Sequence, residues 1–451
     1  NTMDDDTNFD DVDFSEDDVF DQDSWLSGND DTDDDLIFSQ DWDEIDDDTD
    51  DNQSSFDDPL GDDTADDDKV VEDDDSAIDD DISVEDQDSI IQPPNLNQLA
   101  LLSHIDPLKD QPTKYTGTGT YADFCKNDTR LVLPIQQVPT QFAPSNFHSA
   151  KISHLAIVID ISDLSNPTIV SDIPSTLAPS VTGKNPGALD CAFKDNFMFL
   201  AGHHLYTPVY EITSSSVSLV NTYFYENHTL FIEKNKLYFA SFDGSSVATT
   251  VDITNPYLSQ PPITQFMLSA NMIHDVTAVN DIAFYALWHG GFRVVNTSDK
   301  LSAPTVIGTI IPSTGDAFHN AWPSKDQKYL FTSEDRIDGG RAVYDISDIN
   351  NIKFVSRFNI GGTMLHNVVI VDHLAFIAHY KEGLVILDIS DQINPVIIKQ
   401  YDTYKGFQHI NGNIGPWIGA WGIIVEKESD FVYRIFVEDT DSGAFIFRYY
   451  Q

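Results

Sequence analysis

The residues best suited to bind a metal are aspartates near the start of the chain that alternate with other residues in short sets. The sets are Asp11, Asp13 and Asp17; Asp31, Asp33 and Asp35; Asp41, Asp43 and Asp46; Asp46, Asp48 and Asp50; and Asp66 with Asp68. Such spacing can turn several carboxylates towards one centre, and Ca²⁺ takes about six to eight oxygen ligands. No set has the glycine and closing glutamate of an EF-hand loop. We therefore expect irregular calcium sites in this segment.

A second group of candidates consists of polar residues that come directly before short apolar runs. These residues are Asp190, His228, His274, Asp275, His319, Asn320, His366 and Asn367. Neutral imidazoles with carboxylate and amide oxygens can bind a transition metal or hold a small polar ligand. Whether they act together depends on the fold that positions them.

Glu334 and Asp335 form an acidic pair that could complete such a site, or could instead pair with Arg336 or Arg341. The sequence contains no Gly-x-Ser-x-Gly motif, no His-Glu-x-x-His motif, no glycine-rich phosphate loop and no cysteine cluster. We therefore predict a protein that is not an enzyme. A metal-dependent hydrolase that uses the histidines is the least favoured alternative.

The elements that must position these residues recur along the second part of the chain. The phrase LVILDISD at 384–391 returns as AIVIDISD at 156–163 and as AVYDISD at 342–348. Successive copies lie 41 to 51 residues apart, judged from the marker residues Asp160, Glu211, Asp252, Asn296, Asp345 and Asp388. This is the period of one four-stranded blade of a β-propeller, about 40 to 50 residues.

The copies predict an all-β fold with seven blades. The expected blades are 121–174, 187–222, 228–265, 274–310, 318–358, 366–402 and 417–449. The segment from Leu96 to His104 is predicted to supply the missing strand of the last blade and to close the ring. The chain is thus divided into an Asp-rich irregular arm at 1–95 and a propeller at 96–451.

The innermost strand of each blade runs along the central channel of a propeller. The polar residues that open these strands should therefore converge near one mouth of the channel. They could bind a ligand or metal there. They could instead cap the strands and tie neighbouring blades by hydrogen bonds, as a feature that recurs in every blade would do.

The repeat resembles the LVIVD repeat, and four short motifs resemble the choice-of-anchor B family of secreted, surface-associated propellers. The motifs are LLSH at 101–104, FHNAW at 318–322, LHNV at 365–368 and GAWG at 419–422. The resemblance covers about 350 residues. It implies an extracellular or cell-surface location and no settled activity.

The negative charge of the chain is concentrated in the arm. The 451 residues contain 76 acids and 24 bases, and residues 1–90 hold 41 of the acids against the single base Lys69, a net charge of −40. The remainder, 35 acids against 23 bases, has a net charge of −12. This balance excludes nucleic acid as a partner. Apolar residues such as Phe9, Trp25 and Trp42 interrupt the acids, which favours docking on a protein surface over a solvated tail.

Cys125 and Cys191 are the only cysteines, and they predict either one disulfide between distant strands or two buried thiols. Sequons at Asn52, Asn127, Asn227 and Asn296 would carry glycans if the chain passed through a eukaryotic secretory route. No run of about 18 apolar residues exists, so we expect no membrane-spanning segment.

Together these features predict a non-enzymatic extracellular or cell-surface protein. In this hypothesis the arm binds calcium or other divalent cations and joins neighbouring copies into a filament, surface layer or matrix. The alternative is an extracellular ligand-binding or adhesion propeller with a solvated acidic tail.

Overall fold

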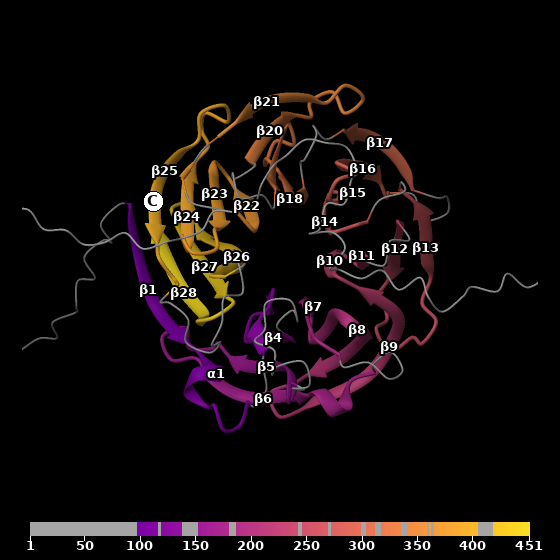
Figure 1. Ribbon diagram of the computed structural model, residues 1–451, viewed down its shortest axis with the longest axis vertical. Helices are drawn as coiled ribbons and strands as arrows, with labels where there is room; N and C mark the ends of the chain where they lie inside the picture. The colour runs from indigo at the N-terminus through magenta and orange to yellow at the C-terminus, as the bar shows by residue number, and fades with distance from the viewer. Residues whose placement is uncertain are drawn as a thin grey trace, which may run out of the picture. The chain divides into compact units, whose positions relative to one another are not determined.

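The computed structural model describes residues 97–451, except 116–118, 138–151, 180–185, 242–245, 269–271, 299–303, 312–316, 335–340, 359, 362–364 and 405–417. Over these residues the chain forms seven antiparallel sheets arranged around a central axis (Figure 1). The fold is therefore the predicted seven-bladed β-propeller. Neither of the helices in the described residues, α1 (Pro107–Asp110) and η2 (Ser175–Leu177), is long and apolar enough to cross a membrane.

The seven blades follow one another along the chain. Blades 1 to 3 contain β2 (Gly119–Tyr121), β3 (Cys125–Lys126), β4 (Arg130–Gln137), β5 (His154–Asp160) and β6 (Thr168–Pro174); β7 (Asp190–Lys194), β8 (Phe197–Ile212) and β9 (Val217–Asn227); and β10 (Thr229–Glu233), β11 (Lys236–Ala240), β12 (Val247–Asp252) and β13 (Ile263–Met267). Blades 4 and 5 contain β14 (Asp275–Val279), β15 (Ile282–Ala286), β16 (Phe292–Asn296) and β17 (Thr305–Ile310); and β18 (Phe318–Pro323), β19 (Tyr329–Glu334), β20 (Arg341–Asp345) and β21 (Lys353–Arg357). Blades 6 and 7 contain β22 (Asn367–Val371), β23 (Leu374–Ala378), β24 (Leu384–Asp388) and β25 (Val396–Tyr401); and β26 (Ala420–Ser429), β27 (Val432–Asp439), β28 (Gly443–Tyr450) and β1 (Gln98–Ile105).

The repeated phrase forms the third strand of a blade because its side chains are buried on both faces. In blade 6, Phe376 and Ile386 belong to the core shared with blade 7, whereas Ile377 and Val385 belong to the core shared with blade 5. Successive residues of a strand point to opposite faces, so each face needs a neighbouring blade to cover it. A closed ring provides that neighbour for every blade.

The aspartate that marks each repeat ends the third strand with a turn. Asp160, Asp252, Asn296, Asp345 and Asp388 each accept a hydrogen bond from the amide two residues later, at 2.8 or 2.9 Å. Such side chains stabilise a turn by replacing a backbone acceptor. The distance in sequence between successive marker residues is therefore the distance between these turns.

Blade 2 departs from the predicted four strands. Its strand β8 pairs with β7 through its first residues and with β9 through its last ones, so the sheet has three strands. The register shifts between Gly202 and Tyr206, where the long strand changes partner. Blade 2 contains only a weak copy of the phrase, with Glu211 at the marker position, and the turn after this copy, at Thr213, separates β8 from β9. No turn separates the two halves of β8 between Gly202 and Tyr206.

The ring is closed by the N-terminal strand, as predicted. Strand β1 pairs antiparallel with β28, from Gln98 opposite Tyr450 to Ile105 opposite Ala444, and completes blade 7 as its outermost strand (Figure 1). The Tyr449 hydroxyl also donates to Asn97 Oδ1 at 3.0 Å. Residues from both ends of the propeller sequence therefore form one sheet.

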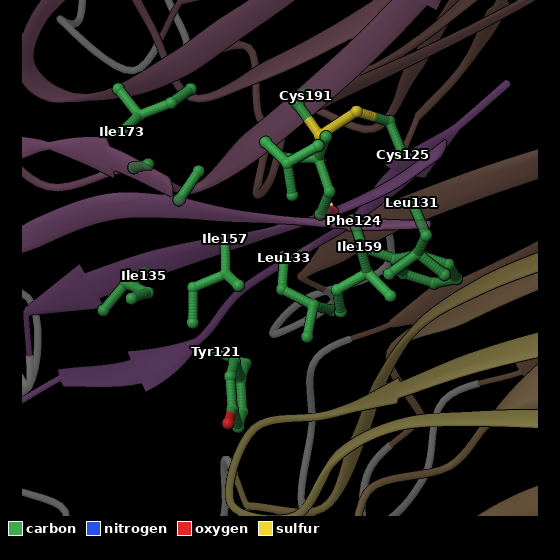
Figure 2. Close-up of a cluster of buried hydrophobic side chains, with 14 of the residues drawn as sticks. Tyr121, Phe124, Cys125, Leu131, Leu133, Ile135, Ile157, Ile159, Ile173 and Cys191 are labelled. Atoms are coloured by element: carbon green, nitrogen blue, oxygen red, sulfur yellow. Dashed lines mark hydrogen bonds between the residues drawn. A yellow bond between two sulfur atoms is a disulfide. The ribbon is translucent and has the colours of Figure 1, made fainter. Parts of the chain in front are cut away.

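A disulfide joins blades 1 and 2 at the channel. Cys125 of β3 and Cys191 of β7 are bonded, with their Cα atoms 5.4 Å apart. Figure 2 shows the bond beside Leu131 and Ile159 of the blade 1 core. The bond links two inner strands that are 66 residues apart in the sequence.

We predict that removing this disulfide with the double substitution Cys125→Ala and Cys191→Ala lowers the free energy of unfolding by about 4 kcal/mol. The chain-entropy relation gives this value for a loop of this length, because the open chain gains conformational freedom when unfolded. Guanidinium unfolding followed by circular dichroism measures the change. Reductant should destabilise the natural chain and leave the double variant unaffected; equal stability of both chains would contradict the prediction.

Candidate functional site in the central channel

A cavity of about 370 Å³ lies where the inner strands of all seven blades meet. Its walls come from the first residues of β3, β7, β10, β14, β18, β22 and β26 and from the residues just before them. The polar residues named from the sequence do converge here: His228, His274, Asp275, His319, Asn320, His366 and Asn367, together with Asp190, all line this cavity.

Two consecutive positions recur at the mouth of the channel in every blade, and we call the residues at these positions the collar. The first position is occupied, from blade 1 to blade 7, by Ala122, Leu189, His228, His274, His319, His366 and Trp421. The second position is occupied by Asp123, Asp190, Thr229, Asp275, Asn320, Asn367 and Gly422. The first position is thus aromatic from blade 3 to blade 7, and the second is polar in every blade except blade 7.

The four histidines stand side by side in an arc that ends on an indole ring. The ring centroids are 4.5 Å apart for His228 and His274, 4.3 Å for His274 and His319, 4.1 Å for His319 and His366, and 4.2 Å for His366 and Trp421. His366 Nδ1 donates to the carbonyl oxygen of Trp421 at 2.9 Å, so this nitrogen carries the hydrogen.

Burial keeps these imidazoles neutral. It lowers the pKa of His228 to about 4 and holds the pKa of His274, His319 and His366 well below the usual value. Neighbouring imidazoles add to this effect, because one charged ring would repel the next. Among the described residues, no group of three or more His, Cys, Asp or Glu side chains is placed to hold a metal ion. Successive rings of the arc contact one another at tilted or edge-on angles of 40° to 67°.

The second position of the collar ties neighbouring blades together. Asp190 Oδ2 accepts from the Leu230 amide at 2.6 Å, Thr229 Oγ1 donates to Asp275 Oδ1 at 3.2 Å, Asn320 Nδ2 donates to Asp275 Oδ2 at 2.6 Å, and the Val368 amide donates to Asn320 Oδ1 at 3.3 Å. Each bond crosses from one blade to the next. These side chains therefore connect neighbouring blades by hydrogen bonds, which is the second of the two roles expected from the sequence.

One bond of the collar passes over a whole blade. Asn367 Nδ2 of blade 6 donates to Asp123 Oδ2 of blade 1 at 2.7 Å, although blade 7 lies between them. The contact is possible because blade 7 has Gly422 at this position, where a Cβ atom would overlap Asp123 Oδ1 and the Phe124 ring. The glycine is required for close approach, and it lets the collar close across the seam of the ring.

The carboxyl groups of the collar hold their protons more tightly than free aspartates do. Burial, followed by repulsion from Asp275, raises the pKa of Asp123 to about 7. Burial also raises the pKa of Asp190 and of Asp275, and nearby Asp123 adds to the effect at Asp190. Glu438 of β27, which accepts from the Gly422 amide at 3.1 Å, has its pKa raised by burial and by Asp123. The mouth therefore contains acids and neutral imidazoles in one confined space.

Glu334, the first residue of the predicted acidic pair, does not join this site. Glu334 is buried at the end of β19 and accepts two hydrogen bonds from Arg357 Nη1, at 2.9 and 3.0 Å. It does not line the cavity. Asp335 lies outside the described residues, as do all the calcium candidates of the arm from Asp11 to Asp68.

The three sequons in the propeller differ in access. Asn227 is buried, and its Nδ2 donates to Thr207 Oγ1 at 3.0 Å, so a glycan there does not fit the folded chain. Asn127 and Asn296 lie in turns and are partly exposed. Glycosylation at these two sites remains a prediction.

Asp123 and Trp421 are among the collar residues that were not named from the sequence as site candidates. Asp123 belongs to blade 1, and its signal is the phrase Asp-Phe-Cys at 123–125, which parallels Asp-Cys at 190–191. Trp421 was noted only as part of a motif. The aromatic character shared with the four histidines is visible once the blades are superimposed in sequence.

Comparison with known proteins supports the repeat. Residues 154–173 and 364–403 match the LVIVD repeat, which places the matches on β5 and β6 of blade 1 and on blade 6. No curated protein matches the chain. The chain is therefore a β-propeller that contains LVIVD repeats, and the matches do not extend to the choice-of-anchor B family.

We predict that Asp123→Asn changes how stability depends on pH above about 6.5. A carboxyl whose pKa is about 7 when folded and 3.8 when unfolded stabilises the fold fully below 3.8, and this contribution is lost as pH rises through 7. The histidine contribution runs the other way and is lost only as pH falls below 6.5 towards 4. Above pH 6.5 the natural chain should therefore lose stability relative to the variant.

Unfolding midpoints in guanidinium at pH 6.5, 7.5 and 8.5 measure this difference. Asp123→Asn can keep the collar intact, because Asn367 Oδ1 has no hydrogen-bond partner among the described residues and can accept once its amide turns over. The matched control is Asp195→Asn, whose side chain is 77% exposed. If Asp123→Asn and the natural chain lose stability in parallel, the proton on Asp123 is not the cause.

Proposed function

Starting from a β-propeller with LVIVD repeats, we propose that this protein is a non-enzymatic extracellular structural protein. Its acidic arm binds Ca²⁺ and joins neighbouring copies into a filament, surface layer or matrix. The propeller is the rigid body that the arm connects. The observation that carries the proposal is the partition of charge, −40 in residues 1–90 against −12 in the rest of the chain.

Calcium explains why such a charge would be kept in one segment. Carboxylates about 6 Å apart repel by roughly 0.7 kcal/mol in water, and a bound divalent cation removes that repulsion. An extracellular site with a dissociation constant of about 10⁻⁴ to 10⁻³ M contributes roughly 4 to 5.5 kcal/mol. Ordering costs about 1 to 2 kcal/mol per residue, so each ion offsets only about three to five residues. The rest must come from apolar contact.

The apolar residues of the arm supply that contact in the proposal. Aromatic residues such as Phe38, Trp25 and Trp42 stand between acids at short intervals. A purely solvating tail has no use for them. Docking of these residues on a neighbouring copy, repeated from copy to copy, would build an open assembly.

One feature of the described body supports an extracellular role. The Cys125–Cys191 disulfide is typical of proteins that work in oxidising surroundings. The arm joins the body at Asn97, next to β1, which is itself held in blade 7 by pairing with β28. A force applied through the arm would therefore act on the strand that closes the ring.

We predict that removing Ca²⁺ with EGTA breaks the assemblies of the full chain into single copies, because the arm carboxylates then repel one another. Dynamic light scattering measures the particle size, and excess Ca²⁺ should restore it. A chain that starts at residue 97 should stay monomeric with and without Ca²⁺.

A second variant separates the metal from the docking contacts. The triple substitution Trp25→Ser, Phe38→Ser and Trp42→Ser keeps every carboxylate, so it should retain calcium binding and lose assembly. Assemblies that survive EGTA, or that form from the chain starting at residue 97, would rule out the arm as the connecting element.

A further inference from the structure

The channel mouth has the shape and composition of a binding site that the arm does not account for. Its volume of about 370 Å³ lies in the range of small-molecule sites, about 300 to 1,000 Å³. The collar provides polar groups at the mouth. Beyond it the wall is apolar, with Leu230, Trp322, Val368 and Ile423 among the lining residues.

The charges around the cavity are of one sign. The lining residues that ionise are Asp123, Asp190, Asp275, the four histidines and Lys126. Lys126 is paired with Glu426, so its charge is already compensated. The histidines are neutral, for the reasons given above. Any uncompensated charge of the lining is therefore negative and comes from the three aspartates when they lose their protons.

Two buried polar atoms at the mouth point to a ligand of hydrogen-bonding type. Within the described residues, His319 Nδ1 and Asn367 Oδ1 have no hydrogen-bond partner of good geometry, although the His319 ring interacts with the His366 backbone, and His319 is only 4% exposed. Both residues line the cavity. Buried polar groups are nearly always paired, so an unpaired set beside a cavity marks a place for a partner.

The geometry favours an organic cation over a metal ion. The imidazoles contact one another at tilted angles of 51° and 59°, and no described group of three donors is placed around a metal position. An ammonium group needs only single hydrogen bonds to oxygens and is also attracted to the face of an indole such as Trp421. Its hydrocarbon chain would pack against the apolar wall.

We propose that the channel mouth binds a small primary alkylammonium ion, with the ammonium group beside Asp123 and the alkyl chain directed along the channel past Trp421. This role goes beyond assembly through the arm. The two can fail separately, because changes in the collar leave the arm intact and removal of Ca²⁺ leaves the collar intact.

Because the collar carboxyl groups are partly protonated, binding of a cation should release protons in a way that depends on pH. The groups that face Asp123 are Asp190, Asp275, Glu438 and the Asn367 amide. With its pKa near 7, Asp123 is mostly protonated at pH 6, and an arriving cation must displace that proton. At pH 8.5 the proton has already been lost. Binding beside Asp123 should therefore release more protons at pH 6 than at pH 8.5.

Isothermal titration calorimetry of the full chain tests this, with n-butylammonium chloride as the probe and n-butanol as its neutral counterpart. About 0.5 M NaCl shortens the Debye length to about 4 Å and suppresses non-specific attraction to the acidic arm. The expected result is one n-butylammonium per chain, at least tenfold weaker binding of n-butanol, and a heat that depends more on the ionisation enthalpy of the buffer at pH 6 than at pH 8.5.

Two substitutions test whether n-butylammonium binds at the collar. Asp123→Asn should weaken n-butylammonium at least tenfold and reduce the release of protons at pH 6, whereas the surface control Asp195→Asn should change neither. Trp421→Phe, which leaves every carboxyl in place, should weaken binding severalfold and keep the proton release. It also serves if Asp123→Asn fails to fold, as judged by circular dichroism.

Three results would overturn the proposal. They are no binding of n-butylammonium, equal binding of n-butanol, and binding that is unchanged in both Asp123→Asn and Trp421→Phe. Titrations with ZnCl₂ and CaCl₂ complete the test. Metal binding that is lost in Asp123→Asn, without binding of n-butylammonium, would assign the collar to a metal instead.

Discussion

The pairing of β1 with β28 is the constraint on which the rest of this structure depends. Every blade has two apolar faces, and each is covered only if the ring is complete. Blade 7 receives its last strand from the beginning of the propeller sequence, so both ends of that sequence lie in one sheet. The ring cannot open at this seam without exposing the cores on either side of blade 7.

Closure also creates the channel mouth, because the collar residues come from all seven blades. Hydrogen bonds between blades occupy most of its polar groups, and the disulfide ties blades 1 and 2 where their inner strands meet. The same residues thus stabilise the ring and determine the charge of the cavity.

Much of the fold could be predicted from the sequence because the residues of the repeat determine a strand and a turn. The LVILDISD phrase encodes a strand buried on both faces and a turn fixed by its aspartate, and the missing strand of the last copy pointed to residues 96–104. The contact of Asn367 with Asp123 could not be predicted, since it spans 244 residues and depends on the absence of a side chain at Gly422. Blade 2 was predicted less well because its copy of the phrase is weak and its second and third expected strands form the single strand β8.

The most direct test of the account is hydrogen exchange of the full chain, followed by mass spectrometry of its peptides. A ring that opens only as a whole protects the amides of β1 and β28 as strongly as those of β23 in the middle of blade 6, because all three exchange through the same global opening. We predict equal, slow exchange for the three strands. Exchange of β1 and β28 that is faster by a hundredfold or more would show that the seam opens on its own and would contradict the account.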